Sequence, residues 1–301
     1  MKDENIKKGI AWLLFSAFGF SMMGMFVKAA GDIPFIQKTL FRNSVAFIIA
    51  FTTLIIHARK DKSILHIEKR AYLWLFLRCV IGVTGIFGNF YAIGKLKLGD
   101  AAMLQKMSPF FAVLGAMIFL GEKPTVFSVG SLIAAFFGSL FVIKPSMELS
   151  AFFPAIIGFI GGIGAGFAAT FVRKLHSYNV SGYVIITTFS LFSTILAVPF
   201  TVLNYTPMTT NQLLCLIGTG VGGACGQFGL TGAYFNASAR KISVYDYSMV
   251  IFSAILGFII FGQIPDFYSF IGYTIIITTA VIVYIVNLRK DTVSKVKQAE
   301  S

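Results

Sequence analysis

The sequence predicts an all-α integral membrane protein with ten transmembrane helices, arranged as two inverted five-helix repeats. Of its 301 residues, 56% are apolar and only 12% are charged, about half the charged share of an average soluble domain. The apolar residues fall into runs of membrane-spanning length, and related motifs recur in the two halves of the chain. A water-facing surface is incompatible with this composition, which excludes a cytosolic enzyme, a disordered chain and a secreted disulfide module.

The first apolar run follows Lys7 and Lys8 and superficially resembles a signal peptide. It continues to about Val27, which is too long for a signal peptide, so we expect a retained first helix. A bilayer core requires about 20 apolar residues per helix, and charges, prolines and polar clusters divide the rest of the chain. We expect helices over about 10–28, 36–57, 71–93, 100–120, 125–143, 152–172, 182–203, 211–234, 244–261 and 267–287.

The orientation follows from the distribution of Lys and Arg between the two sides of the membrane. With the N-terminus inside, the inner gaps and tails contain 17 of the 25 cationic residues and the outer gaps contain 5. This bias predicts an inner (plasma) membrane protein with both termini in the cytoplasm. The net charge of +13 is therefore explained by the orientation of the chain in the membrane and not by nucleic-acid binding. We expect the lipid bilayer as a partner and no nucleic acid.

Two similar turns divide the chain into repeats. Gly121-Glu122-Lys123-Pro124 ends the fourth expected helix, and Gly262-Gln263-Ile264-Pro265 ends the ninth, 141 residues later. Phe111-Ala112 and Phe252-Ser253 share the same offset. Because each half has an odd number of helices, the second enters the membrane from the opposite side. We expect an N-terminal repeat over 1–147 and a C-terminal repeat over 148–301, with a site near the midplane between them.

These halves resemble the EamA branch of the drug/metabolite transporter superfamily, over about residues 10–287. The fourth-helix segment 99–112 has small residues followed by Pro109, and the segment 120–123 contains the Gly-Glu pair with which this helix typically ends in the family. Arg42 and Arg78 also fall where the family often has arginine. The second half departs from the pattern, with Val250 in place of the proline and Gln263 in place of the glutamate. The resemblance implies transport of a small metabolite, and favours export over uptake.

Three cations lie inside expected spans, where each costs a few kcal/mol unless it faces protein, water or an anion. Arg42 and Lys106 lie six or seven residues from the outer side, roughly 10 Å deep at 1.5 Å per residue, and we expect them to hold an anion jointly. Arg78 lies at similar depth from the cytoplasmic side. The alternative for any one of them is a side chain that snorkels to the interface.

The repeat offset also relates two polar segments. Superposing the Gly-x-x-Pro turns matches Gln105-Lys106 with two residues of Tyr245-Asp246-Tyr247, and the resemblance implies that these helices line the central cavity. Asp246 is the one carboxylate expected within a span. It contributes to this cavity or forms an interfacial ion pair with Arg240 or Lys241.

Pro109 removes a helical hydrogen bond and clashes with the carbonyl of Gln105. It either bends the helix so that this carbonyl faces the cavity, or bends it with no role in recognition. Asn43, Asn89 and Gln227 are neutral polar residues that either bind the solute or join helices. The substrate-binding candidates are Arg42, Arg78, Asn89, Gln105, Lys106, Gln227, Tyr245, Asp246 and Tyr247.

Catalytic and phosphate-binding motifs are absent from the sequence, so we expect no enzyme, cofactor or metal. The surplus of intramembrane cations predicts an alternating-access transporter, secondary-active or facilitative, for a small anionic or zwitterionic metabolite such as an amino acid or carboxylate. The alternatives are a membrane-anchored enzyme or scaffold and, among transporters, a cationic drug exporter. The small-molecule substrate is the expected partner, and a monomer and a homodimer remain open.

Overall fold

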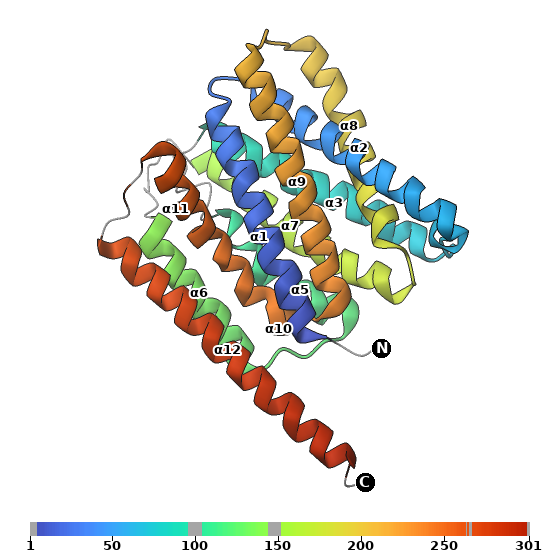
Figure 1. Ribbon diagram of the computed structural model, residues 1–301, viewed down its shortest axis with the longest axis vertical. Coiled ribbons are helices and arrows are strands. Elements are labelled where there is room, and N and C mark those ends of the chain that lie inside the picture. The colour runs from blue at the N-terminus through green and yellow to red at the C-terminus, as the bar shows by residue number, and fades with distance from the viewer. Residues whose placement is uncertain (1–4, 96–103, 144–151, 263, 265–266, 300–301) are drawn as a thin grey trace.

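The computed structural model describes residues 5–95, 104–143, 152–262, 264 and 267–299, and every regular element within them is helical (Figure 1). Within these described residues, eight helices are long and apolar enough to cross a membrane, and two shorter apolar helices lie between them in the chain, Ser108–Leu120 and Val126–Phe141. The chain is therefore a multi-pass membrane protein.

The helices follow the expected apolar runs closely, with ends that extend by a few residues. The last helix continues well beyond residue 287 and projects from the bundle (Figure 1). The elements are α1 (Ile6–Ala29), α2 (Phe35–Lys60), η1 (Lys62–Leu65), α3 (Ala71–Lys95), α5 (Ser108–Leu120), α6 (Val126–Ile143), α7 (Phe152–Ser177), α8 (Gly182–Leu203), α9 (Thr210–Asn236), α10 (Ala239–Ile242), η3 (Ser243–Tyr247), α11 (Ser248–Phe261) and α12 (Phe267–Ala299).

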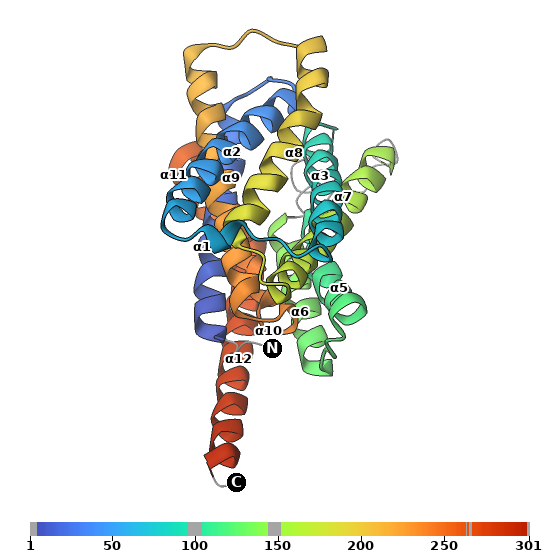
Figure 2. The same cartoon turned by 90° about the vertical axis from the view of Figure 1, so that its right-hand side faces the viewer.

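Both ends of the chain lie at the same end of the bundle, which we call the terminal face (Figures 1 and 2). There α1 begins beside the end of α9, and the Asn5 N–H donates a hydrogen bond to the Asn236 carbonyl at 2.9 Å. The 3₁₀ turn η1 directly follows α2, and its Ser63 and Ile64 line a cavity together with Trp12 of α1. The beginning of α1 and the end of α12 thus lie toward the same end of the bundle (Figures 1 and 2).

The fourth and ninth expected helices are interrupted at matching positions. In the first half, Lys106 and Met107 form a turn, and α5 begins only at Ser108. Pro109 lies in the first turn of α5, where its missing N–H costs no helical hydrogen bond. It therefore begins a helix instead of bending a continuous one. In the second half, the 3₁₀ segment η3 separates α10 from α11.

The repeated glycines end these two short helices in the same way. Gly121 and Gly262 follow α5 and α11 with φ angles of 66° and 63°. A residue with a Cβ is disfavoured in this left-handed conformation, which is the usual C-terminal cap of a helix. The Gly-x-x-Pro motif recognised in the sequence thus encodes a helix end in both halves.

Helices from opposite halves form the main contacts of the bundle. The helix α1 packs against α9 and α11, while α3 and α5 pack against α7. In addition, α2 packs against α8 and α6 against α12 (Figures 1 and 2). Glycines allow the closest approach: a Cβ on Gly222 of α9 would lie 2.7 Å from the Met23 nitrogen and 2.9 Å from the Gly19 oxygen of α1.

We expect the substitution Gly222→Val to lower stability by roughly 1–3 kcal/mol, because the added side chain meets backbone that cannot rotate away. Thermal unfolding of the detergent-solubilised protein measures this effect. Gly24→Val on α1 is the matched control, since nothing lies within 4 Å of a Cβ at Gly24. Equal melting temperatures for the two variants would show that α1 and α9 are not in backbone contact.

Candidate functional site

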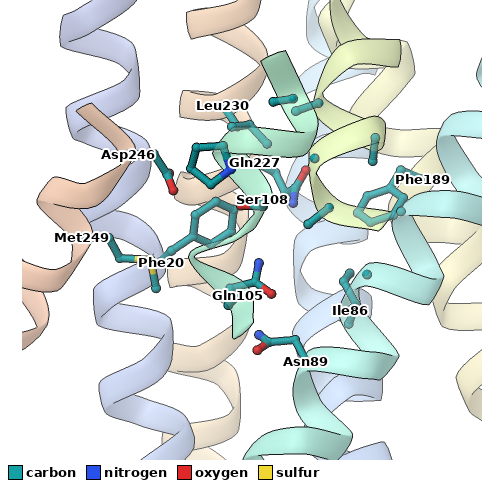
Figure 3. Close-up of a pocket in the computed structure, with 18 of the residues that line it drawn as sticks. Phe20, Ile86, Asn89, Gln105, Ser108, Phe189, Gln227, Leu230, Asp246 and Met249 are labelled. Atoms are coloured by element: carbon teal, nitrogen blue, oxygen red, sulfur yellow. The ribbon is translucent and has the colours of Figure 1, made fainter. Parts of the chain in front are cut away.

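A cavity of about 130 Å³, with several charged and polar side chains in its lining, lies between α1, α2, α3, α5, α7, α8, α9, η3 and α11, in the interior of the bundle. Figure 3 shows Asp246 on one wall and Phe189 on the opposite wall, with Gln105 and Gln227 between them. Eight of the residues singled out in the sequence line this cavity: Arg42, Arg78, Asn89, Gln105, Lys106, Pro109, Gln227 and Asp246.

Two buried arginines form one side of the cavity. Arg42 is 1% exposed and Arg78 is 3% exposed. The Arg42 Nη1 donates to Asn43 Oδ1 at 2.6 Å, and the Arg78 Nη2 donates to Gln227 Oε1 at 3.0 Å. Neither guanidinium has a carboxylate partner within the described part of the chain, and the Nε of each has no hydrogen-bond acceptor there. This side of the cavity therefore holds two uncompensated positive charges.

The aromatic ring of Phe189 on α8 contacts both cations. The Arg78 Cζ lies 4.0 Å from the ring centroid and the Arg42 Cζ lies 5.9 Å from it. Glycines make room for the two side chains: a Cβ on Gly223 would lie 2.9 Å from the Arg42 Nε, and one on Gly82 would collide with the Arg78 guanidinium. A ring face stabilises a cation only partly, so the charges of the two guanidiniums remain incompletely compensated.

The third buried cation, Lys106, is neutralised by Asp246. The Lys106 Nζ lies 3.2 Å from Asp246 Oδ2 and also donates to the Asp246 backbone carbonyl at 3.2 Å. The Tyr247 hydroxyl donates to the Lys106 carbonyl at 3.0 Å. These bonds join the two interruptions, because Lys106 precedes α5 and residues 246 and 247 belong to η3. The interior charges are thus arranged as an arginine pair and an ion pair.

Arg42 and Lys106 both line this cavity, and their joint binding of an anion stays a prediction. Arg78, which comes from the other side of the membrane in the sequence, shares the Phe189 ring with Arg42. Asp246 pairs with Lys106, and Arg240 instead donates to the Lys123 carbonyl at 2.9 Å.

The two tyrosines beside Asp246 do not line the cavity. Tyr247 is fully buried and acts through its bond to the Lys106 backbone, whereas Tyr245 belongs to the hydrophobic core against which Tyr284 packs. By contrast, Gln105 keeps a buried Oε1 that has no hydrogen-bond partner among the described residues. Gln105 and Asn89 both belong to the lining of the cavity.

Sequence reasoning missed Phe189, Ser108 and Met249, which also line the cavity (Figure 3). Phe189 is one of 33 phenylalanines, and nothing in its neighbourhood in the sequence marks it. Met249 contacts Lys106 through its sulfur, at 3.3 Å from Nζ. The only signal for Met249 in the sequence was its place directly after Asp246-Tyr247-Ser248 in the second half of the chain.

A bundle of membrane-spanning helices around an interior cavity that contains charged side chains is typical of a membrane carrier. The sequence model of the EamA-like transporter family matches residues 7–144 and again 152–285. The chain belongs to the EamA-like transporter family, and it is a transporter and not an enzyme.

Relatives with curated names are transport proteins. The chain is 27% identical over 282 residues to the pseudopaline exporter CntI of Pseudomonas aeruginosa, covering 92% of this chain and 95% of the relative. It is 23% identical over 286 residues to a riboflavin transporter of Vibrio cholerae, covering 90% of each. A crystal structure with 13% identity shares the fold, with a TM-score of 0.80 over 95% of this chain and 99% of that one.

Proposed function

We propose that the protein transports a small anionic or zwitterionic metabolite by alternating access, as a secondary-active or facilitative carrier, with the solute bound in the central cavity. The observation that carries this proposal is the pair of buried arginines without carboxylate partners. Burying such charges is costly unless an anion compensates them. A guanidinium with free N–H donors is suited to a carboxylate, which it grips with two parallel hydrogen bonds.

The opposite wall supports a zwitterion, such as an amino acid. Asp246 is the carboxylate of the cavity, and its side chain keeps 19% of its surface exposed while it pairs with Lys106. An ammonium group near Asp246 and a carboxylate near Arg42 and Arg78 would match the charges on the two walls (Figure 3). The volume of about 130 Å³ also favours a small metabolite, since drug-sized sites measure roughly 300–1,000 Å³.

We also propose that the ten apolar helices form two inverted five-helix repeats, over 1–147 and 148–301. In this relation each helix of the first half corresponds to the helix at the same place in the second, so that α1 corresponds to α7, α3 to α9 and α5 to α11. The contact of α1 with α9 then corresponds to that of α7 with α3, and the contact of α1 with α11 to that of α7 with α5. The contacts α2–α8 and α6–α12 correspond to themselves. The matching interruptions before α5 and α11 support the same relation.

Such symmetry supports alternating access, in which α1, α9 and α11 rock against α3, α5 and α7. Polar contacts close the space between these groups toward the terminal face. Arg173 of α7 donates to the Tyr234 carbonyl of α9 at 3.3 Å, while its ion pair with Glu122 at 2.9 Å stays within the group of α3, α5 and α7. The Arg173–Tyr234 contact would have to break for the cavity to open toward the terminal face.

Solute flux tests the proposed function directly. The purified protein in liposomes is offered labelled neutral amino acids, dicarboxylates, organic amines and uncharged sugars, with protein-free liposomes as the control. We expect saturable flux for a carboxylate-bearing solute and none for the amines. Flux of amines alone would support a cationic drug exporter and overturn the proposal, and flux of none would favour a scaffold.

The coupling mode follows from the same charges. Because Asp246 is neutralised by Lys106, it is poorly placed to carry a proton, and we propose facilitated transport or exchange. In these liposomes, a pH gradient alone is therefore expected not to accumulate the solute, whereas unlabelled solute inside should accelerate uptake. Many-fold accumulation driven by pH and lost in Asp246→Asn would contradict this mode.

We propose that the terminal face is cytoplasmic, because the Lys and Arg residues are concentrated in the gaps expected on that side. We expect a single cysteine at Ser63, in η1, to resist a membrane-impermeant thiol reagent in intact cells. A cysteine at Asn204, in the exposed connection after α8, should react. The parent protein controls for its native cysteines, and the reverse labelling pattern would invert the topology.

A further inference from the structure

A second cavity, of about 450 Å³, lies near the terminal face and is distinct from the central one. The helix α9 separates the two. Gln227, Leu230 and Tyr234 line the central cavity, whereas Phe228, Thr231 and Phe235 line the second one. Each residue of the second set follows one of the first, which rotates its side chain by about 100° around the helix. The second cavity therefore lies on a neighbouring face of α9.

Flat aromatic rings form the walls of this cavity. Trp12 of α1, Tyr183 of α8, and Phe228 and Phe235 of α9 all line it. The His176 ring stacks on Phe235, with centroids 4.0 Å apart and planes 27° from parallel. Trp12 lies directly over Gly232, where a Cβ would come within 2.7 Å of the indole ring. The walls are thus suited to stacking on a planar ring.

A hydrogen-bonding group is also buried in the wall. Thr231 is 4% exposed, and its hydroxyl has no hydrogen-bond partner among the described residues. Thr219, earlier in the same helix, instead donates to the Cys215 carbonyl of the preceding turn at 2.9 Å. A buried hydroxyl without a partner is unfavourable, so Thr231 provides an anchor for a ligand that carries an acceptor.

The charges in the lining further restrict the ligand. The cavity is lined by Trp12, Ser63, Ile64, His176, Asn179, Val180, Ser181, Gly182, Tyr183, Ile186, Phe228, Thr231, Gly232 and Phe235, without a carboxylate, lysine or arginine. Among the described residues, the lining therefore lacks the permanently charged side chains that are present in the central cavity. Its volume falls within the range of roughly 300–1,000 Å³ typical of sites for drug-sized molecules.

We propose that this cavity is a second binding site, for a neutral planar aromatic molecule that stacks between the rings and accepts a hydrogen bond from Thr231. The site is separate from solute translocation in the central cavity. Its ligand would contact α1, α8 and α9 together, and would therefore hold helices of both halves at the terminal face.

Trp12 provides the readout, because it is one of only two tryptophans. In a Trp74→Phe background, 4-nitrobenzamide is titrated against the detergent-solubilised protein, since its nitroaromatic ring quenches a stacked indole. We expect saturable quenching. Thr231→Val keeps the shape of the side chain and should weaken binding roughly 3–10-fold, the value of one neutral hydrogen bond. The matched control Thr219→Val should bind as the parent does.

Two further comparisons make the outcome decisive. Cyclohexanecarboxamide has the same acceptor without the flat ring and should not compete, whereas unlabelled benzamide should relieve the quenching. Phe235→Leu removes one wall without removing the hydroxyl and should also weaken binding. Non-saturable quenching that is equal in all variants would overturn the proposal. So would quenching by brominated lipid that the nitroaromatic cannot displace, because an acyl chain would then occupy the cavity.

This test is independent of the proposed transport function. Arg42→Gln alters the central cavity on the other face of α9 and should leave quenching of Trp12 unchanged. If flux is lost in that variant while quenching persists, the two sites are separate. If quenching is also lost from a folded Arg42→Gln protein, the second site is not distinct from the first.

Discussion

Replacing Arg42 or Arg78 by glutamine is expected to weaken solute binding by roughly 10–150-fold, which corresponds to about 1.5–3 kcal/mol for a charge-assisted hydrogen bond. Both guanidiniums are buried beside Phe189, and neither has a carboxylate partner in the described part of the chain. Removing one charge also relieves the repulsion between them, so the folded protein should lose no stability. Equilibrium binding and liposome uptake measure the effect, and thermal unfolding checks the fold.

Lysine variants and a double variant test whether the guanidinium groups themselves bind the solute. Arg42→Lys and Arg78→Lys should restore binding only in part, because an ammonium group lacks the planar fork of the guanidinium. The double glutamine variant should lose less than the sum of the single losses, since both groups grip one ligand. Arg59→Gln on the exposed end of α2 is the matched control. Normal affinity in both single variants would show that the two arginines do not hold the solute.

Breaking the Lys106–Asp246 pair should have the largest effect on stability. Removing one partner of a buried ion pair typically costs about 3–5 kcal/mol, and we expect the lower end because Asp246 remains 19% exposed. Asp246→Asn and Lys106→Gln should each lower the melting temperature by roughly 6–12 °C and abolish transport. Glu68→Gln in the exposed connection before α3 controls for the loss of a surface charge.

A double substitution separates folding from function. Lys106→Met combined with Asp246→Leu removes both charges, and apolar replacement of a whole buried pair is often neutral or stabilising. We expect the melting temperature to return to near that of the parent while transport stays absent, because the cavity has lost its carboxylate. Recovery of transport in the double variant would show that the pair is only structural.

The Lys106–Asp246 pair also illustrates what sequence reasoning could not resolve. The repeat offset relates Gln105-Lys106 to Asp246-Tyr247, and each of these segments precedes a short helix that is followed by a glycine in the left-handed conformation. It did not predict that Lys106 and Asp246 would bond to each other. Equivalent positions in two repeats meet only if they lie close to the axis that relates the repeats, and no local pattern reports that distance.

Pro109 illustrates a second kind of difference. Its presence in a long apolar run predicted a bent helix, whereas the chain turns at Lys106-Met107 and α5 begins one residue before the proline. The second half is interrupted at the matching place without a proline, at η3. The interruption therefore depends on tertiary contacts, such as the bond from Tyr247 to the Lys106 carbonyl, which satisfy the backbone groups that the break releases.

The sequence by itself determined the class of protein, the positions of the apolar helices and the set of charges that had to be buried. Each span can be recognised from its own residues, because every span must be apolar and long enough to cross the same bilayer. Only the tertiary structure decided which charges meet. It placed Arg42 and Arg78 on Phe189 and neutralised Lys106 with a carboxylate 140 residues away. Which charges pair depends on which helix faces pack against each other. Glycine contacts between distant segments set this packing, and a local sequence pattern does not contain its geometry.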